Sequence, residues 1–401
     1  MIRFFAVMAF VLCHAANAQD FSGLARLDVA QSQIGDADGA LRIDLQLSQA
    51  VPYRVFTQDS PKRLIIDFQE VDFTGASRAG LLNTDLADDV FFGPLYPGWS
   101  RMVVRLAGPM AIAQAGMQVT PDTGRAKIRI QMQATDDIDF SKNVGAPSGG
   151  IWDQMPLPKP QVDAAPDGPM VIAIDPGHGG IDSGAAPAGV READLMLALG
   201  IELADAINRT QTMRAVLTRN ADYFVALEQR MTLARQAHAD ALISLHADAL
   251  AAGDARGASV YTLAKDAFGG ASQRMAERHE QGDLVAGLDL QGQGDRITGV
   301  LMDLARHETG PAGEALADAL VRGLRGAGVP LHPRPRRYGQ LAVLNAPDFA
   351  SVLLEAGFLT NASDRAALSD PLQRANWVNG IVAGLENWAQ LRAANAPLIR
   401  Q

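Results

Sequence analysis

The stretch Val171-Ile172-Ala173-Ile174-Asp175-Pro176-Gly177-His178-Gly179-Gly180 joins a short apolar run to a glycine-rich turn that carries one histidine. An apolar run bounded by proline and glycine is typical of a buried strand in a parallel sheet. The glycines allow the backbone to turn sharply after the strand. The pattern therefore places His178 at the carboxyl end of a strand, where ligands and catalytic groups collect in open α/β sheets.

The composition is that of a globular protein, and the length of 401 residues indicates two domains with extensions. Hydrophobic residues make up 48% and charged residues 20% of the chain, which argues against wholesale disorder and against a bundle of membrane helices. The formal net charge is -10. An acidic total of this size argues against nucleic acid as the main partner.

The first residues have the pattern of a cleavable secretory signal peptide, assigned to residues 1–18. A positive charge precedes an apolar run at residues 4–13, and small residues follow it. This run is shorter than the roughly 20 residues that span a bilayer, so we expect no transmembrane segment in the mature protein. A lipoprotein attached at Cys13 is the less favoured alternative. Cleavage after Ala18 removes the only cysteine, so a metal site would have to use His, Asp and Glu.

Residues 19–140 show the period-two alternation of an all-β, sandwich-like domain. Apolar residues alternate with polar ones over two stretches, and further apolar runs at 64–68 and 102–106 are additional strand candidates; the alternating apolar residues are Leu41, Ile43, Leu45, Leu47, Ile128, Ile130 and Met132. The titratable residues of this region form no catalytic pattern. We therefore expect a binding or purely structural role for it.

Clustered prolines and glycines predict a semi-extended linker at residues 141–169. After it, residues 170–401 alternate between strands and amphipathic helices. This alternation predicts an α/β domain with a mostly parallel sheet flanked by helices. The expected strands are 171–175, 215–218, 241–245, 259–263 and 351–354, and the expected helices are 192–209, 227–239 and 371–392.

Four polar residues stand at or near the expected strand ends. His178, His246 and Glu355 each follow an apolar run, and Glu192 follows the glycine-spaced loop. Two imidazoles and one carboxylate are a ligand set of catalytic zinc that leaves one coordination position open. We expect His178, Glu192 and His246 to bind Zn²⁺ and Glu355 to carry protons.

Each of these residues also has a structural interpretation when taken alone. A histidine at a strand end is more often hydrogen-bonded scaffolding than a ligand, and Glu192 could simply favour a helix N-terminus. Glu355 is harder to explain structurally, because a buried carboxylate needs a partner or a shifted pKa. Asp175 has two interpretations: it orients a ligand or it forms the turn. The coincidence of the four residues favours a site.

The motifs at these positions resemble those of the zinc-dependent N-acetylmuramoyl-L-alanine amidases; they are residues 175–180 with Asp182 and Gly184, then 191–194, 244–248 and 354–361. The resemblance implies zinc bound by His178, Glu192 and His246, with Glu355 as the catalytic glutamate. It also implies hydrolysis of the amide bond between N-acetylmuramic acid and L-alanine in peptidoglycan. Ala193 stands where the family usually has a lysine. We expect that difference to affect the surface beside the site more than the metal ligands.

Residues 51–56 and 61–68 resemble the AMIN domain, a β-sandwich module that precedes secreted cell-wall amidases. The resemblance implies peptidoglycan binding and localisation to the division site, and the signal peptide implies a periplasmic location. A β domain without a ligand is the alternative.

Residues 264–340 form a stretch that is too long for a simple crossover between strands. One interpretation is a set of extra helices that widens the scaffold. The resemblance implies instead an inserted helix that covers the zinc until a LytM-type activator protein displaces it. An acidic side chain caps the metal in such proteins, and Glu277, His279 and Glu280 are the candidates for that role here.

The sequence thus predicts a periplasmic zinc amidase that acts in daughter-cell separation and is autoinhibited by its insert. Two alternatives remain. A zinc peptidase could cut within the stem peptide, or the chain could be a non-catalytic peptidoglycan-binding regulator.

Overall fold

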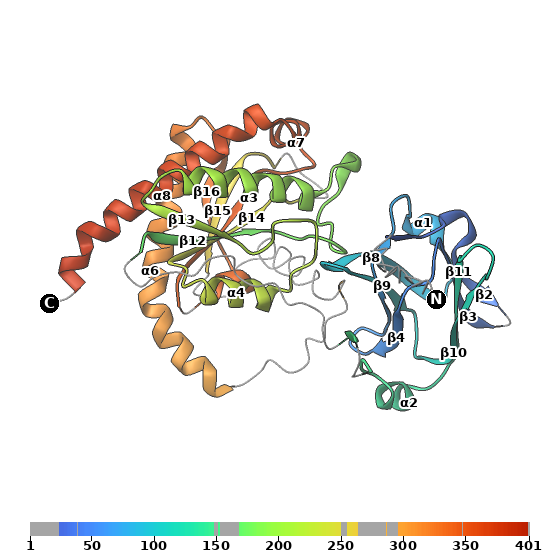
Figure 1. Ribbon diagram of the computed structural model, residues 1–401. Coiled ribbons are helices and arrows are strands. Elements are labelled where there is room, and N and C mark those ends of the chain that lie inside the picture. Colours follow the sequence, from blue (N-terminus) through green and yellow to red (C-terminus); the bar gives the residue numbers. More distant parts are fainter. Residues whose placement is uncertain are drawn as a thin grey trace, which may run out of the picture.

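The computed structural model describes residues 24–37, 39–147, 151–152, 168–249, 255–263, 286, 296–346 and 348–399. They form an N-terminal β-rich domain and a C-terminal α/β domain, as the sequence predicted (Figure 1). The expected signal peptide, most of the expected linker and residues 264–285 lie outside the described residues. Within the described ranges, no helix combines the length and the apolar character needed to cross a membrane.

Two sheets build the N-terminal domain. One has the order β10 (Met110–Val119), β11 (Ala126–Ala134), β3 (Ala40–Leu47), β2 (Gln33–Ala37) and β7 (Leu82–Asn83). The other has the order β4 (Tyr53–Gln58), β5 (Arg63–Gln69), β9 (Trp99–Leu106) and β8 (Ala87–Tyr96). The remaining elements are the paired strands β1 (Ala25–Arg26) and β6 (Val71–Asp72), the 3-10 helix η1 (Val29–Gln31), and the helices α1 (Arg78–Leu81) and α2 (Asp137–Lys142).

The alternating residues of the two sheets point into one shared core. Ile43 on β3 pairs with Ile130 on β11, and both are fully buried. They belong to the same apolar cluster as Leu64 and Ile66 of β5, from the opposite sheet. The period-two pattern of the sequence therefore produces a β sandwich.

The sheet β4-β5-β9-β8 is also covered on its outer face. Ile65 on β5 and Val103 on β9 belong to a second apolar cluster, outside the sandwich core. Both residues are at most 1% exposed. This explains the unbroken apolar runs in β5 and β9, because a strand buried on both faces has no need of alternating polar residues.

The C-terminal domain has a six-stranded sheet with helices on both faces (Figure 1). Its order is β13 (Met213–Leu217), β12 (Met170–Pro176), β14 (Ala241–His246), β17 (Ala350–Glu355), β15 (Ala258–Leu263) and β16 (Leu331–Gly339). Neighbouring strands are parallel except for β15 and β17, which are antiparallel. The predicted mostly parallel sheet is confirmed.

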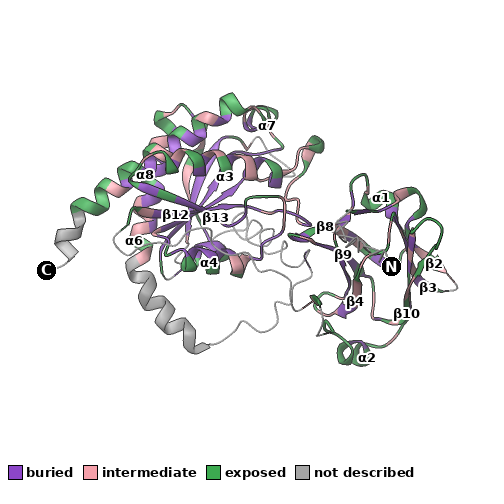
Figure 2. Cartoon of the chain, viewed as in Figure 1, coloured by how far each residue is buried: buried purple, intermediate pink, exposed green. Residues whose placement is uncertain are grey.

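Side chains of the central strands divide between the two helical layers. Ile172 and Ile174 of β12 share a cluster with residues of three helices, α3 (Glu192–Asn208), α6 (Arg296–Gly326) and α8 (Pro371–Ile399). Val171 and Ala173 pack on the other face with α4 (Leu227–Gln236). Figure 2 shows these central strands as buried. The shorter elements are α7 (Ala362–Ser369) and the 3-10 helices η3 (Pro187–Gly189) and η4 (Ala342–Leu344).

The second half of the expected insert belongs to this fold. One face of α6 between Leu316 and Leu324 is buried in the core, and β16 is an edge strand of the sheet. Two prolines and three arginines in β16 break the alternation expected of a strand. An edge strand tolerates them because one of its sides makes no ladder hydrogen bonds.

Candidate metal centre

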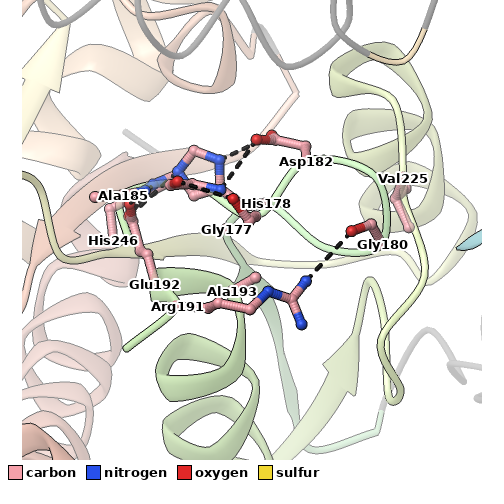
Figure 3. A network of polar contacts seen from close by, with 12 residues as sticks. Gly177, His178, Gly180, Asp182, Ala185, Arg191, Glu192, Ala193, Val225 and His246 are labelled. Atoms are coloured by element: carbon pink, nitrogen blue, oxygen red, sulfur yellow. Dashed lines mark hydrogen bonds and ion pairs between the residues drawn. The ribbon is translucent and has the colours of Figure 1, made fainter. Parts of the chain in front are cut away.

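The predicted site residues meet at one edge of the C-terminal sheet. His178 follows β12, His246 ends β14, and Glu355 ends β17. His246 and Glu355 are directly paired in register, because these two strands are parallel neighbours. Glu192 opens α3 and turns its carboxylate to the same edge (Figure 3). The arrangement expected from the strand ends is present in the structure.

His178 lies in a strained turn and has two carboxylate neighbours. Its φ of 58° is in the left-handed region, which costs a residue with a side chain of the order of 1 kcal/mol or more. Its Nδ1 lies 2.8 Å from Asp182 Oδ2, and its Nε2 lies 3.2 Å from Glu192 Oε1. Asp182 also accepts the Gly184 N–H at 3.1 Å. Asp182 thus orients one ring nitrogen and leaves the other directed at the site.

Glu192 is buried at the centre of the cluster. Its Oε1 lies 3.1 Å from His246 Nδ1 and accepts the Ala247 N–H at 2.9 Å. Its Oε2 accepts the Ala185 N–H at 3.0 Å. One ligand atom from each of His178, Glu192 and His246 lies within 4.8 Å of the others. These donors and their closeness fit a divalent transition metal such as zinc.

The charges of the cluster set the protonation of its members. Burial opposes a charge on His178, but the carboxylates of Asp182 and Glu192 outweigh it and raise the His178 pKa well above 6.5. Burial likewise opposes ionisation of Glu192, yet the two histidines hold its pKa well below 4.5. Burial lowers the pKa of His246. A metal that bound here would therefore compete with a proton on His178.

Glu355 lies beside this cluster in a different electrostatic environment. It is completely buried, and Asp248 donates its N–H to Oε2 at 3.0 Å. Burial, together with the negative charges of Asp248 and Glu192, raises the pKa of Glu355 well above 4.5. A carboxylate of this kind can take up a proton near neutral pH.

A second layer of buried charges fixes the turn that carries His178. Asp175 forms an ion pair with Arg230 at 2.7 Å and accepts hydrogen bonds from Thr218 and Ser244. Arg230 in turn donates to the His178 carbonyl at 2.8 Å. Asp175 therefore acts on the candidate ligand His178 through Arg230 and the backbone, a role between the two interpretations that the sequence left open.

Arg219 supports the same turn from the other side. It donates hydrogen bonds to the carbonyls of Pro176, Gly177 and Ala193. Burial and the nearby positive charge of Arg230 lower the pKa of Arg219 to about 10. Ala193, where the family usually has a lysine, is fully buried beside this turn and does not itself lie on the surface.

Two glycines leave the space in which the candidate ligands meet. A Cβ on Gly177 would lie 2.3 Å from His246 Cε1, and a Cβ on Gly184 would lie 2.7 Å from Glu192 Oε2. Gly179 and Gly180 leave room for other residues: a Cβ on Gly179 would meet Tyr223, and a Cβ on Gly180 would meet Pro94. Within the glycine-rich turn, Gly177 thus makes room for the candidate ligands, whereas Gly179 and Gly180 do not.

Sequence reasoning did not assign roles to Asp182, Arg219 and Arg230. Arg219 follows β13 and so stands at the same sheet edge as the other site residues, a position that could have identified it. Arg230 lies within α4, where an arginine is normally an exposed charge, and no sequence signal separates it from one. The proposed capping residues Glu277, His279 and Glu280 lie outside the described residues.

Comparisons with known proteins identify both domains. The family model described as N-acetylmuramoyl-L-alanine amidase matches residues 172–387, and the AMIN domain model matches residues 33–130. N-acetylmuramoyl-L-alanine amidase AmiC of Escherichia coli O6:H1 is 28% identical over 89% of this chain and 88% of its own length. AmiC of Neisseria meningitidis serogroup B is 29% identical over 86% of each chain.

A solved structure, N-acetylmuramoyl-L-alanine amidase AmiC2 of Nostoc punctiforme, is 25% identical with a TM-score of 0.41, covering 55% of this chain and 97% of its own. The amidase family model covers more than half of the sequence, from β12 to α8. The chain therefore belongs to the N-acetylmuramoyl-L-alanine amidase family and carries an AMIN domain ahead of its catalytic domain.

Proposed function

We propose that this chain is a periplasmic zinc amidase that cuts the bond between N-acetylmuramic acid and the L-alanine of the peptidoglycan stem peptide. The observation that carries the proposal is the convergence of His178, Glu192 and His246 within 4.8 Å, beside a buried Glu355. A zinc ion held by these three residues would activate water and polarise the scissile carbonyl.

Protein groups around the metal carry out the proton transfer and hold the candidate ligands in place. Glu355 takes the proton of the attacking water and passes it to the leaving nitrogen of L-alanine, a transfer for which its raised pKa suits it. The Asp248 N–H, 3.0 Å from Oε2, fixes the direction of that carboxylate. Asp182 keeps the His178 ring oriented, and Arg230 holds the backbone of the same residue.

Mass spectrometry of digested cell walls tests this reaction against its alternatives. The amidase releases intact stem peptides that begin with L-alanine and leaves glycan strands without peptide. A zinc peptidase would instead release shortened peptides and leave stubs on the glycan. A non-catalytic wall-binding protein would release nothing, and either of these two results would contradict the proposal.

We further propose that the enzyme acts in daughter-cell separation and that residues 264–295 limit its basal activity until a LytM-type activator binds. The support is the resemblance of this stretch to the inserts of division amidases and the presence of three residues able to cap zinc, Glu277, His279 and Glu280. A two-state equilibrium of this kind responds to a partner that binds only the open state.

Deletion of residues 269–295, which end before α6, tests the regulation separately from the reaction. The shortened chain should hydrolyse peptidoglycan faster than the full chain in the absence of any activator. Unchanged activity in a deletion variant that keeps its helical ellipticity would contradict autoinhibition and leave the proposed reaction in place.

A further inference from the structure

The two domains share an interface that reaches the loop carrying His178. Strand β8 of the AMIN domain extends toward the catalytic domain (Figure 1). Ile181 donates its N–H to the Pro94 carbonyl at 3.0 Å, and Phe224 donates its N–H to the Leu95 carbonyl at 3.1 Å. Two consecutive carbonyls of one strand thus bind two different loops of the catalytic domain.

A local irregularity in β8 makes this double contact possible. Consecutive carbonyls of a regular strand point in opposite directions. The pairing of β8 with β9 shifts register between Pro94 and Tyr96, leaving Leu95 unpaired. A bulge of this kind turns the strand locally. Because β8 is also an edge strand of its sheet, both carbonyls are available to the other domain.

Two glycines let the backbones approach closely at this interface. A Cβ on Gly93 would lie 3.0 Å from both the Cα and the N of Ile181. A Cβ on Gly180, whose φ is +59°, would lie 2.0 Å from the Pro94 oxygen. The requirement for glycine at position 180, the third glycine of the motif around His178, is therefore set by the AMIN domain.

Apolar side chains from both domains bury one another beside these hydrogen bonds. The shared cluster combines AMIN residues with catalytic-domain residues, among them Leu95, Tyr96, Trp99, Ile181, Phe224 and Ala226. Ile181 is 5% exposed and Phe224 is 1% exposed. The interface has an apolar core like that of a stable protein contact.

The outer face of the same AMIN sheet also binds Ala286, from the stretch between β15 and α6. Arg101 donates a hydrogen bond to the Ala286 carbonyl at 2.6 Å, and Ala286 is fully buried in the shared cluster. An ion pair with Asp67 at 2.6 Å fixes the Arg101 side chain, which is 6% exposed. The AMIN sheet therefore contacts three separate segments of the catalytic domain.

The interface is connected to the candidate metal ligand through a short run of backbone. Arg191 donates to the Gly180 carbonyl (Figure 3). Asp222 accepts the Gly180 N–H at 2.7 Å and also accepts a hydrogen bond from Arg191. Asp182, one residue beyond the Ile181 contact, holds the His178 ring. The backbone from Gly180 to Asp182 thus links the contact with the AMIN domain to Asp182, the residue that holds the ring of the candidate ligand His178.

We propose that the AMIN domain clamps the turn at residues 180–182 and so holds Asp182 against His178. The clamp is an interaction surface within the chain, made by Gly93, Pro94 and Leu95 on one side and by Ile181 and Phe224 on the other. The inference rests on the proposed function only where it treats His178 as a zinc ligand. When the clamp is lost, the ligands remain but the turn moves more freely, and zinc leaves faster.

A matched pair of glycine variants in the full chain tests the clamp. Gly93→Val adds side-chain atoms whose nearest neighbours are the Ile181 and Gly180 backbones. Gly116→Val is the control, because Gly116 lies on β10 of the same domain and a Cβ there meets nothing within 4 Å. Valine suits a strand at both positions. Leu95→Ala provides a second interface variant if Gly93→Val fails to fold.

The first measurement is hydrogen exchange at the Ile181 and Phe224 amides, which needs neither metal nor substrate. Exchange should be at least about tenfold faster in Gly93→Val than in the wild-type chain, with no change in Gly116→Val. Unchanged protection of both amides in Gly93→Val would overturn the interface.

The second measurement is the rate of zinc release to a chelator. Release should be about tenfold faster in Gly93→Val, the size typical of losing support behind a metal ligand. Faster amide exchange without faster release would overturn the clamp. If His178→Ala retained zinc as well as the wild-type chain does, the metal assignment itself would fail. That failure can be told apart from failure of the interface, because the exchange measurement is made without metal.

Discussion

Replacing Asp175 with asparagine removes one charge from the buried network behind the metal centre. The carboxylate lies 2.7 Å from Arg230, and the two side chains are 0% and 4% exposed. Asparagine keeps the size of the side chain but leaves the guanidinium buried without its counter-charge. Breaking one partner of a buried pair typically costs about 3–5 kcal/mol. We expect the free energy of unfolding of the catalytic domain to fall by that amount.

Urea unfolding followed by ellipticity at 222 nm measures this loss, because the long helices α3, α6 and α8 belong to the catalytic domain. Asp348→Asn is the matched control. Asp348 pairs with Arg235 at the surface, where the two side chains are 49% and 39% exposed. An exposed pair contributes about 0–1 kcal/mol, so the control should unfold almost as the wild-type chain does.

The dependence on pH gives a second check on Asp175. Burial opposes its ionisation, but Arg230 and two hydroxyl donors outweigh burial and lower its pKa below 3.8. A carboxyl whose pKa is lower in the folded chain than in the unfolded chain stabilises the fold at pH values above its unfolded-state pKa. This stabilisation is lost as the pH falls through the pKa of the folded state. The difference between the wild type and Asp175→Asn should be complete at neutral pH and should shrink below pH 3.8. A neutral-pH loss of less than about 1 kcal/mol would refute the assigned role.

Three further predictions concern the shape, support and chemistry of the site. In a zinc titration, Gly177→Ala should lower zinc affinity at least about tenfold, because its Cβ would lie 2.3 Å from the His246 ring. Gly310→Ala is the control and should bind zinc normally, because a Cβ at Gly310 meets open space. Asp364→Ala should lower the free energy of unfolding by about 1–3 kcal/mol, because it removes the buried acceptor of the Gly257 and Phe358 amides. Asp205→Ala is the control and should leave the free energy of unfolding unchanged, because Asp205 is exposed. A chelator should abolish hydrolysis, and added Zn²⁺ should restore it; activity that persisted in metal-free protein would contradict the proposed zinc chemistry.

The convergence of the candidate site residues was predictable because these residues stand at strand ends. In a parallel sheet, consecutive strands end at the same edge, so His178, His246 and Glu355 had to approach one another once their strands were recognised. Glu192 follows the same logic at a helix start. The α/β pattern was equally clear, since each buried strand of the sheet is a short apolar run between helical segments.

The remaining features depend on contacts between distant segments. Arg230 resembles any surface arginine of a helix until Asp175 is placed beside it. Strand β16 lacks the usual pattern because it is an edge strand rich in arginine and proline. The role of Gly180 is set by a carbonyl from the other domain, and no local rule of sequence could reveal that neighbour.

The most direct test of the proposed centre compares zinc content and peptidoglycan hydrolysis in Glu355→Gln and in the exposed control Glu386→Gln. We expect both variants to bind one zinc per chain, since Glu355 is not among the three ligands. Hydrolysis by Glu355→Gln should fall by at least about 100-fold, the usual contribution of a general base, while Glu386→Gln should keep full activity. Undiminished hydrolysis by zinc-loaded Glu355→Gln would contradict the proton-transfer role and with it the proposed division of labour at the site.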